Sequence, residues 1–170
     1  MLSQYDQLKK NISDYSSAYK AYWSDLETVI NRMESEIVNS LGVPNSNQLV
    51  VDGKHLGKHV NVGIKGKVSQ LSAVDSATAD KMPKNHDEMS ISFAISIGIE
   101  IPGSKMPVGN YFDVKACISE NQFVFSFTPT NNEEFMVYVA RGMAANVSLE
   151  KVSTAIFEFI NSRYDASKLK

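Results

Sequence analysis

The stretch from Gly53 to Lys67 carries the side chains in this sequence that are best suited to holding an anion. It contains four lysines, four glycines and no acidic residue. Positive charges beside exposed glycine backbone can hold a phosphate group or the backbone of a nucleic acid. The lysines are Lys54, Lys58, Lys65 and Lys67.

The same stretch lacks the other features of a nucleotide site. None of its Gly-Lys pairs has a glycine five residues before its own glycine, so the spacing of a phosphate-binding loop is not met. No aromatic residue is present to stack on bases. Two interpretations stay open: an anion site, and a solvated hairpin whose lysines protect an exposed strand edge.

Histidine, carboxylate and cysteine side chains do not show the spacing of a catalytic or metal site. His55 and His59 are separated by glycine, which opposes a helix, and on a strand they would lie about 13 Å apart. His86 and the two acids after it fit a charged loop, because adjacent side chains point in different directions. Cys117, the only cysteine, has no nucleophile signature around it. We predict no catalytic residue, no metal and no cofactor, and we favour a binding protein over an enzyme.

Aromatic and apolar residues form a stripe along the first forty residues. Neither proline nor glycine occurs from Leu2 to Leu41, and apolar residues recur at alternating steps of three and four. This heptad pattern is typical of a helix that packs against another helix. Gly42 and Pro44 end the pattern as a helix cap and a helix breaker. The stripe consists of Tyr5, Leu8, Ile12, Tyr15, Tyr19, Tyr22, Leu26 and Val29, with Trp23 beside it.

A helix over residues 1–41 would be too long for its own domain. It would measure roughly 60 Å at about 1.5 Å per residue. A compact domain of this length has a radius of gyration of only about 15 Å. Part of the helix must therefore project, break or meet a partner. Ser24 and Glu27 form a capping-box pattern, so one helix or two remain possible.

The tyrosines suggest what the projecting part does. Tyrosine is enriched where a ring is buried against a partner while its hydroxyl stays in water. We therefore predict a protein-binding surface, with either another protein or a second copy of the chain as the partner. Its residues are Tyr5, Tyr15, Tyr19, Tyr22 and Trp23.

Alternating apolar residues between positions 48 and 140 predict an antiparallel sheet of five or six strands. The longest alternation runs from Met89 to Ile101 and needs an apolar cover along its whole length. Residues 135–140 are ambiguous between strand and helix, and we choose strand. Residues 72–87 are polar and lack a period, so we predict a mobile surface loop. The remaining strands are predicted at 48–51, 60–68, 111–118 and 123–127.

A second amphipathic helix is predicted at residues 148–164, capped by Ser148 or Asn146. Its apolar stripe starts at Leu149 and includes Ile156 and Ile160. The fold class is therefore α+β, a single domain over residues 1–170 in which an antiparallel sheet is flanked by a long N-terminal helix and a C-terminal helix. We expect both helices on the apolar face of the sheet.

Composition narrows the function classes. A net charge of −2 and a pI near 5.9 disfavour a surface built for nucleic acid or an anionic membrane. The single cysteine, the absence of a signal-like run and the absence of a membrane span predict a cytoplasmic protein with no membrane partner. We expect a protein-interaction module, such as an adaptor, inhibitor, chaperone-like or immunity-type protein, and a homodimer as its simplest form. The alternatives are a small ligand between sheet and helices, and an anion or nucleic acid at residues 53–67.

Overall fold

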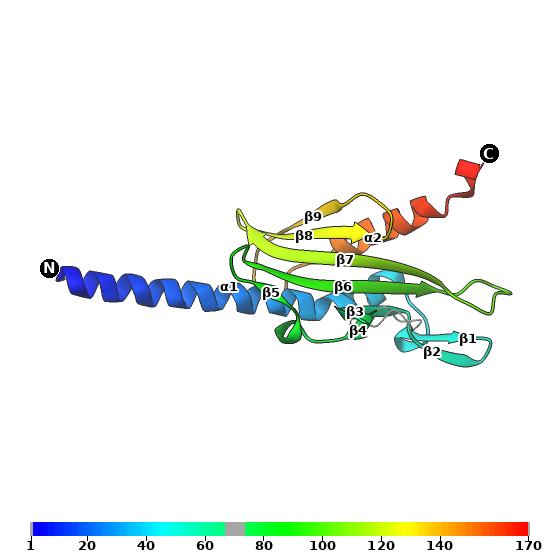
Figure 1. Cartoon of the computed structure of the whole chain (residues 1–170), viewed down its shortest axis with the longest axis horizontal. Coiled ribbons are helices and arrows are strands. Elements are labelled where there is room, and N and C mark those ends of the chain that lie inside the picture. The colour runs from blue at the N-terminus through cyan, green and yellow to red at the C-terminus, as the bar shows by residue number, and fades with distance from the viewer. Residues whose placement is uncertain (1, 67–73, 170) are drawn as a thin grey trace.

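In the computed structural model a single unbroken helix, α1 (Gln4–Leu41), accounts for the first forty residues (Figure 1). The structure describes residues 2–66 and 74–169. Ser3 caps the start, because its hydroxyl accepts a hydrogen bond from the backbone N–H of Asp6 at 3.1 Å. Gly42 ends the helix in the left-handed region with φ of 64°. The break considered at Ser24 does not occur.

Among the described residues, seven antiparallel strands form the main sheet in the order β4-β3-β6-β7-β8-β9, with β5 paired beside β6 (Figure 1). A separate hairpin joins β1 to β2, and the helix α2 follows the sheet. The bounds are β1 (Gln48–Val51), β2 (Lys54–Lys58), β3 (Val60–Lys65), β4 (Val74–Ser76), β5 (Lys84–Asn85), β6 (Ser90–Ile99), β7 (Val108–Ser119), β8 (Gln122–Pro129), β9 (Phe135–Ala140) and α2 (Glu150–Arg163). Short 3-10 turns lie at Asn45–Asn47, Ala79–Lys81 and Ala166–Leu169.

The predicted α+β class is confirmed, and so is the strand at 135–140. The six predicted strands are all present, and β2, β4 and β5 add to them. Residues 67 and 68 of the second predicted strand lie outside the described residues. The Gly53 to Lys67 stretch is not one hairpin, because β2 pairs with β1 whereas β3 enters the main sheet.

The prediction of a mobile loop at 72–87 was wrong for its described part, residues 74–87. This segment contains β4, a 3-10 turn and β5. Ala79 and Met82 are buried in the core, and Asn31 of α1 accepts a hydrogen bond from the Ala79 N–H at 2.7 Å. Strands of two or three residues are too short to produce a recognisable period in the sequence. Contacts with α1 and β6 position this segment instead.

The core lies between one face of the sheet and both helices. From α1 it receives Trp23, Leu26, Val29, Ile30, Met33 and Ile37, and from α2 Val152, Ile156 and Ile160. The sheet contributes alternating residues, including Ile95 of β6, Phe112 of β7 and Phe125 of β8, each fully buried. Both helices therefore cover the apolar face, as their stripes predicted.

Polar side chains on the flanks of α1 fix its position on the sheet. Asp25 pairs with Arg141 at 2.8 Å, and Glu27 pairs with Lys84 of β5. Arg32 donates to the carbonyl of Ala144 at 2.7 Å. These contacts, together with the buried stripe, hold the middle of the helix but do not reach its first four turns.

Gly63 of β3 provides a direct test of the sheet. A Cβ at this position would lie 1.9 Å from the backbone oxygen of Asp75, whereas a Cβ at Gly109 of β7 would meet nothing within 4 Å. We expect Gly63→Ala to lower the free energy of unfolding by about 1–3 kcal/mol or more, because the backbone of β4 would have to move. Gly109→Ala is the matched control and should change it by less than about 0.5 kcal/mol. Urea unfolding measures both, and equal stabilities would contradict the β3–β4 pairing.

Candidate functional site

The first turns of α1 extend beyond the rest of the domain (Figure 1). Every residue from 4 to 18 is exposed, and Tyr19 is the first that is partly buried. We call residues 4–18 the overhang. At about 1.5 Å per residue the overhang measures roughly 22 Å, or about four helical turns.

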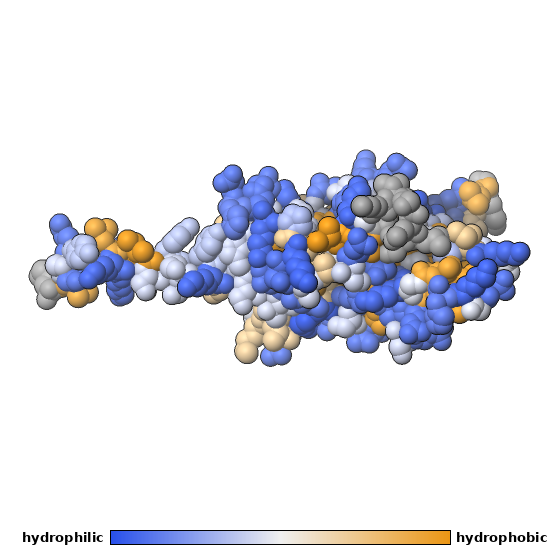
Figure 2. Space-filling model, turned by 60° about the horizontal axis from the view of Figure 1, so that its bottom comes forward, coloured by the Kyte–Doolittle hydropathy of each residue, from blue (hydrophilic) through white to orange (hydrophobic). Residues whose placement is uncertain are grey.

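Apolar side chains are exposed on the overhang (Figure 2). Tyr5, Leu8, Ile12 and Tyr15 are 67%, 59%, 68% and 71% exposed. Their steps of three and four place them on a single face, which we call the overhang stripe. An exposed apolar stripe of this size on the projecting part of a helix is typical of a protein-binding surface.

The charges of the overhang cancel. Asp6 and Asp14 carry two negative charges, and Lys9 and Lys10 carry two positive charges. The Lys9 ammonium lies 4.8 Å from the centre of the Tyr5 ring, within cation–π range. The overhang therefore carries no net side-chain charge.

An aromatic cluster marks the point where α1 meets the sheet. The Tyr19 hydroxyl lies 2.8 Å from Nδ1 of His86, and the two rings stack with centres 6.5 Å apart. Trp23 contacts His86 edge-to-face at 5.2 Å, and the Lys84 ammonium lies 5.7 Å from the indole. Trp23 is buried and its Nε1 has no hydrogen-bond partner among the described residues.

Tyr22 binds its own sheet. Its hydroxyl donates to the carbonyl of Met89, just before β6, and accepts from the N–H of Ile118 on β7 at 2.9 Å. Burial raises the pKa of the Tyr22 hydroxyl, so it stays protonated and can make both bonds at neutral pH. Of the five predicted partner-binding residues, the structure therefore leaves Tyr5 and Tyr15 exposed on the overhang, places Tyr19 at the edge of the core, and uses Tyr22 and Trp23 for internal packing.

The described lysines of the 53–67 stretch lie on two different sheets. Lys54 and Lys58 belong to β2, and Lys65 ends β3, where its ammonium lies 5.8 Å from the Tyr111 ring centre. Lys67 lies outside the described residues.

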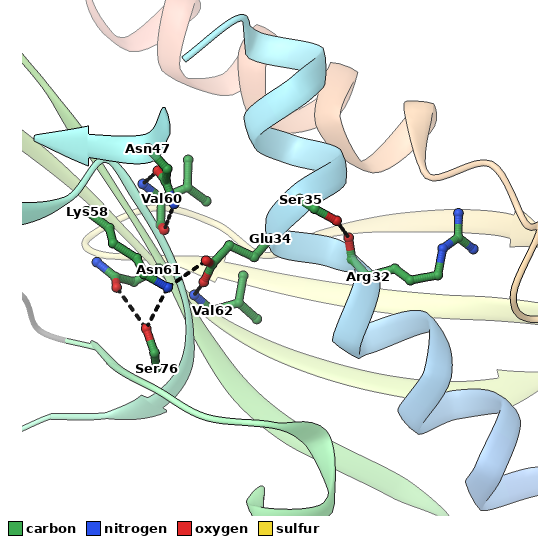
Figure 3. Close-up of polar contacts among 9 residues, drawn as sticks. All are labelled: Arg32, Glu34, Ser35, Asn47, Lys58, Val60, Asn61, Val62 and Ser76. Atoms are coloured by element: carbon green, nitrogen blue, oxygen red, sulfur yellow. Dashed lines mark hydrogen bonds and ion pairs between the residues drawn. The ribbon is translucent and has the colours of Figure 1, made fainter. Parts of the chain in front are cut away.

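The Lys58 charge is already balanced by Glu34 of α1 (Figure 3). Lys58 donates to one oxygen of the Glu34 carboxylate at 2.7 Å, and the other oxygen accepts from the Val62 N–H at 3.3 Å. Ser76 of β4 joins the same network by donating to Asn61 at 3.1 Å. This network ties α1 to β2, β3 and β4, so the described lysines give little support to an anion site.

Other reactive side chains show no catalytic arrangement in the described part of the chain. His55 is exposed on β2, and no group of three or more histidine, cysteine or acidic side chains there could hold a metal ion. Cys117 is half-buried on β7, and burial raises the pKa of its thiol while Lys115 opposes the shift only in part. The thiol is therefore protonated at neutral pH, which makes it a poor nucleophile.

A groove of about 630 Å³ lies at the far end of α1 from the overhang. It is bounded by the end of α1, the end of β6 and the last turns of α2, and its apolar walls include Leu41, Ile99, Ile101, Phe157 and Tyr164. A small-ligand cavity between sheet and helices was among the alternatives drawn from the sequence, but no residues were assigned to that cavity. A signal was available in the long alternation, because its apolar positions continue to Ile101, two residues beyond the end of β6, although Ile99 and Ile101 are 39% and 46% exposed.

The hydroxyl of Tyr22 offers a test of how α1 is anchored. Tyr22→Phe removes the acceptor of the Ile118 N–H and the donor to Met89. We expect it to lower the free energy of unfolding by about 1–3 kcal/mol, because polar backbone groups lose their partners. Tyr19→Phe is the matched control, since its hydroxyl makes one exposed bond, and should cost less than about 0.5 kcal/mol. Thermal unfolding measures the stability of both variants. An equal loss of stability in the two would contradict the bridging role of Tyr22.

Cys117 should react slowly with a thiol reagent. Its raised pKa and its burial both lower the amount of accessible thiolate. At pH 7.5 we expect the folded protein to react with Ellman's reagent more slowly than the urea-unfolded protein by about tenfold or more. Equal rates in the two states would show that the thiol is exposed and reactive.

No described helix is long and apolar enough to cross a membrane. Comparison with protein-family models, curated proteins and solved structures found no match. The molecule itself presents two apolar surfaces, the overhang stripe and the groove, at opposite ends of α1.

Proposed function

We propose that this chain is a non-enzymatic protein-interaction module that pairs with a second copy of itself through the overhang stripe. The proposal rests on the exposure of Tyr5, Leu8, Ile12 and Tyr15. Each of these side chains is more than half exposed on the overhang. Burying a large apolar side chain contributes about 1.5–3 kcal/mol. Four of them in heptad spacing give each chain of a helix pair an apolar seam to bury.

The overhang also benefits from a partner for its own stability. Isolated helices shorter than about 12–15 residues are marginal in water, and most helical stability in proteins comes from packing of an apolar face. The overhang has the exposed face, and the described sheet does not cover it. A second helix against the stripe supplies this packing.

Several features favour an identical helix as the partner. The overhang has no net charge, since its two aspartates balance its two lysines. The positions that flank the stripe in the heptad are Gln4, Lys9, Asn11, Ser16 and Ala18, of which only Lys9 is charged. Two copies therefore meet without a row of like charges, and a symmetric pair uses the same surface on both chains.

A helix of another protein is the second candidate partner, and it would make the chain an adaptor, inhibitor or chaperone-like protein. The single cysteine suits a cytoplasmic setting, whether the partner is a second copy of the chain or another protein. The basic stretch supports the nucleic-acid alternative less well, because Lys58 is paired with Glu34 and the lysines are divided between sheets.

The double variant Ile12→Ser with Tyr15→Ser tests the proposal. Both residues are more than two-thirds exposed, so the domain should fold normally while the affinity of the pair falls by at least about tenfold. Light scattering coupled to size exclusion, over a range of concentrations, measures the association state. Far-ultraviolet circular dichroism checks that the sheet is intact.

Met136→Ser with Tyr138→Ser is the matched control. These residues are 50% and 48% exposed on β9, away from the overhang. The control should associate like the wild type. A wild type that stays monomeric at high concentration, or a stripe variant that associates as strongly as the control, would contradict self-association through the overhang.

A further inference from the structure

The groove at the far end of α1 has a polar end as well as apolar walls. Its volume of about 630 Å³ is in the range of small-molecule sites. The apolar walls come from the ends of α1, β6 and α2, and Phe157 on the α2 side is 55% exposed. The polar end is formed by His59, which links β2 to β3, and by Glu100, which follows β6.

His59 is held in one orientation and has one nitrogen without a partner. The residue is only 6% exposed, and its Nδ1 lies 2.9 Å from the carbonyl oxygen of Gly98. A carbonyl only accepts, so Nδ1 carries the proton and Nε2 of the neutral ring is an acceptor. Among the described residues Nε2 makes no hydrogen bond, and the nearest charged group is the Glu100 carboxylate, with Oε1 at 3.6 Å.

With the ring neutral, Nε2 and the Glu100 carboxylate are two acceptors that face one another, and one shared donor would satisfy both. A buried polar atom without a hydrogen bond is unfavourable, so a group that donates to Nε2 is stabilised there. Glu100 is 41% exposed at its side chain and can move to admit such a group. The polar end of the groove therefore favours a ligand that donates hydrogen bonds.

The surrounding electrostatics favour a positive charge on that donor. Both α1 and α2 end beside the groove, and a helix C-terminus carries partial negative charge. The last turn of α1 has no basic residue. Arg163 in the last turn of α2 lies over the Tyr164 ring at 5.8 Å. Among the described residues that line the groove, none is lysine or arginine, and Glu100 supplies the one carboxylate.

We propose that the groove binds a small amphipathic amine, with its apolar body along Ile99, Ile101 and Phe157 and its protonated amino group between His59 and Glu100. An ammonium has three donors and no acceptor, so it can reach Nε2 and the carboxylate together. A fatty acid would bring a second carboxylate next to Glu100. An alcohol has one donor and no charge. The site is independent of the overhang and of its proposed partner.

Three probes that share a ten-carbon chain test the head group: decylamine, decanol and decanoate. Each is titrated into the isotope-labelled protein, and the amide signals are followed by nuclear magnetic resonance. We expect decylamine to shift signals at the ends of α1, β6 and α2, and to bind more tightly than decanoate by about tenfold or more, because the carboxylate of decanoate is repelled where the ammonium is held. Decanol should fall between the two.

Glu100→Gln separates the charged contact from the apolar one. It should weaken decylamine binding about two- to fivefold, as expected for a partly exposed ion pair, and leave decanol binding unchanged. Glu158→Gln is the matched control, because it makes the same charge change on α2 but lies outside the groove. The control should bind all three probes like the wild type.

Three results would overturn the proposal: no signal shifts at the groove with decylamine, equal binding of decylamine and decanoate, or equal decylamine affinity of Glu100→Gln and Glu158→Gln. Phe157→Ser should weaken all three probes alike, since Phe157 contacts only the apolar body. A Phe157→Ser variant that binds the probes as the wild type does would place them elsewhere and would also overturn the proposal. None of these outcomes bears on the association state, which is measured separately.

Discussion

Burial of one face of α1 between Trp23 and Ile37 is the contact on which the rest of the structure depends. Leu26, Val29 and Met33 have no exposed surface, and the sheet residues opposite them are buried by the same contact. Because the helix is unbroken, fixing its middle also fixes both of its ends. One end becomes the overhang and the other becomes a wall of the groove.

The heptad stripe changes its environment along the helix. Its first four members face water, Tyr19 and Tyr22 lie at the boundary, and the remaining members are buried by the sheet. Tyr22 marks the change, since its ring continues the stripe while its hydroxyl binds backbone groups of two strands. The N-terminal part of the same pattern thus remains available for a partner after the domain has satisfied the rest.

Much of this fold could be predicted because the long elements have clear periods. The alternation around Ile95 and the phenylalanines of β8 predicted strands, and the stripe of α2 predicted a helix. The pattern of α1 predicted the helix but not where its burial begins, because Tyr15 and Tyr22 are the same residue type in the same register. What separates them is the position of Met89 and Ile118 in space, about seventy and a hundred residues away in the chain.

The parts that sequence reasoning missed depend on contacts between distant segments. Glu34 of α1 balances Lys58, so a lysine that looked free in the sequence is paired in the fold. The walls of the groove come from the ends of three elements, α1, β6 and α2. Its histidine, His59, was considered in the sequence only as a metal ligand. Such sites leave no local pattern, since their residues come from segments far apart in the chain.

The overhang and the groove can act without interfering with each other. Pairing of two overhangs leaves the grooves uncovered, because each groove lies at the opposite end of its own α1. Coupling between the two surfaces would require an element with two alternative arrangements. The helix that joins them is continuous, buried along one face and held by ion pairs at Asp25, Glu27 and Glu34, so it offers a single arrangement. Ligand binding at one end and association at the other should therefore contribute independently to the free energy.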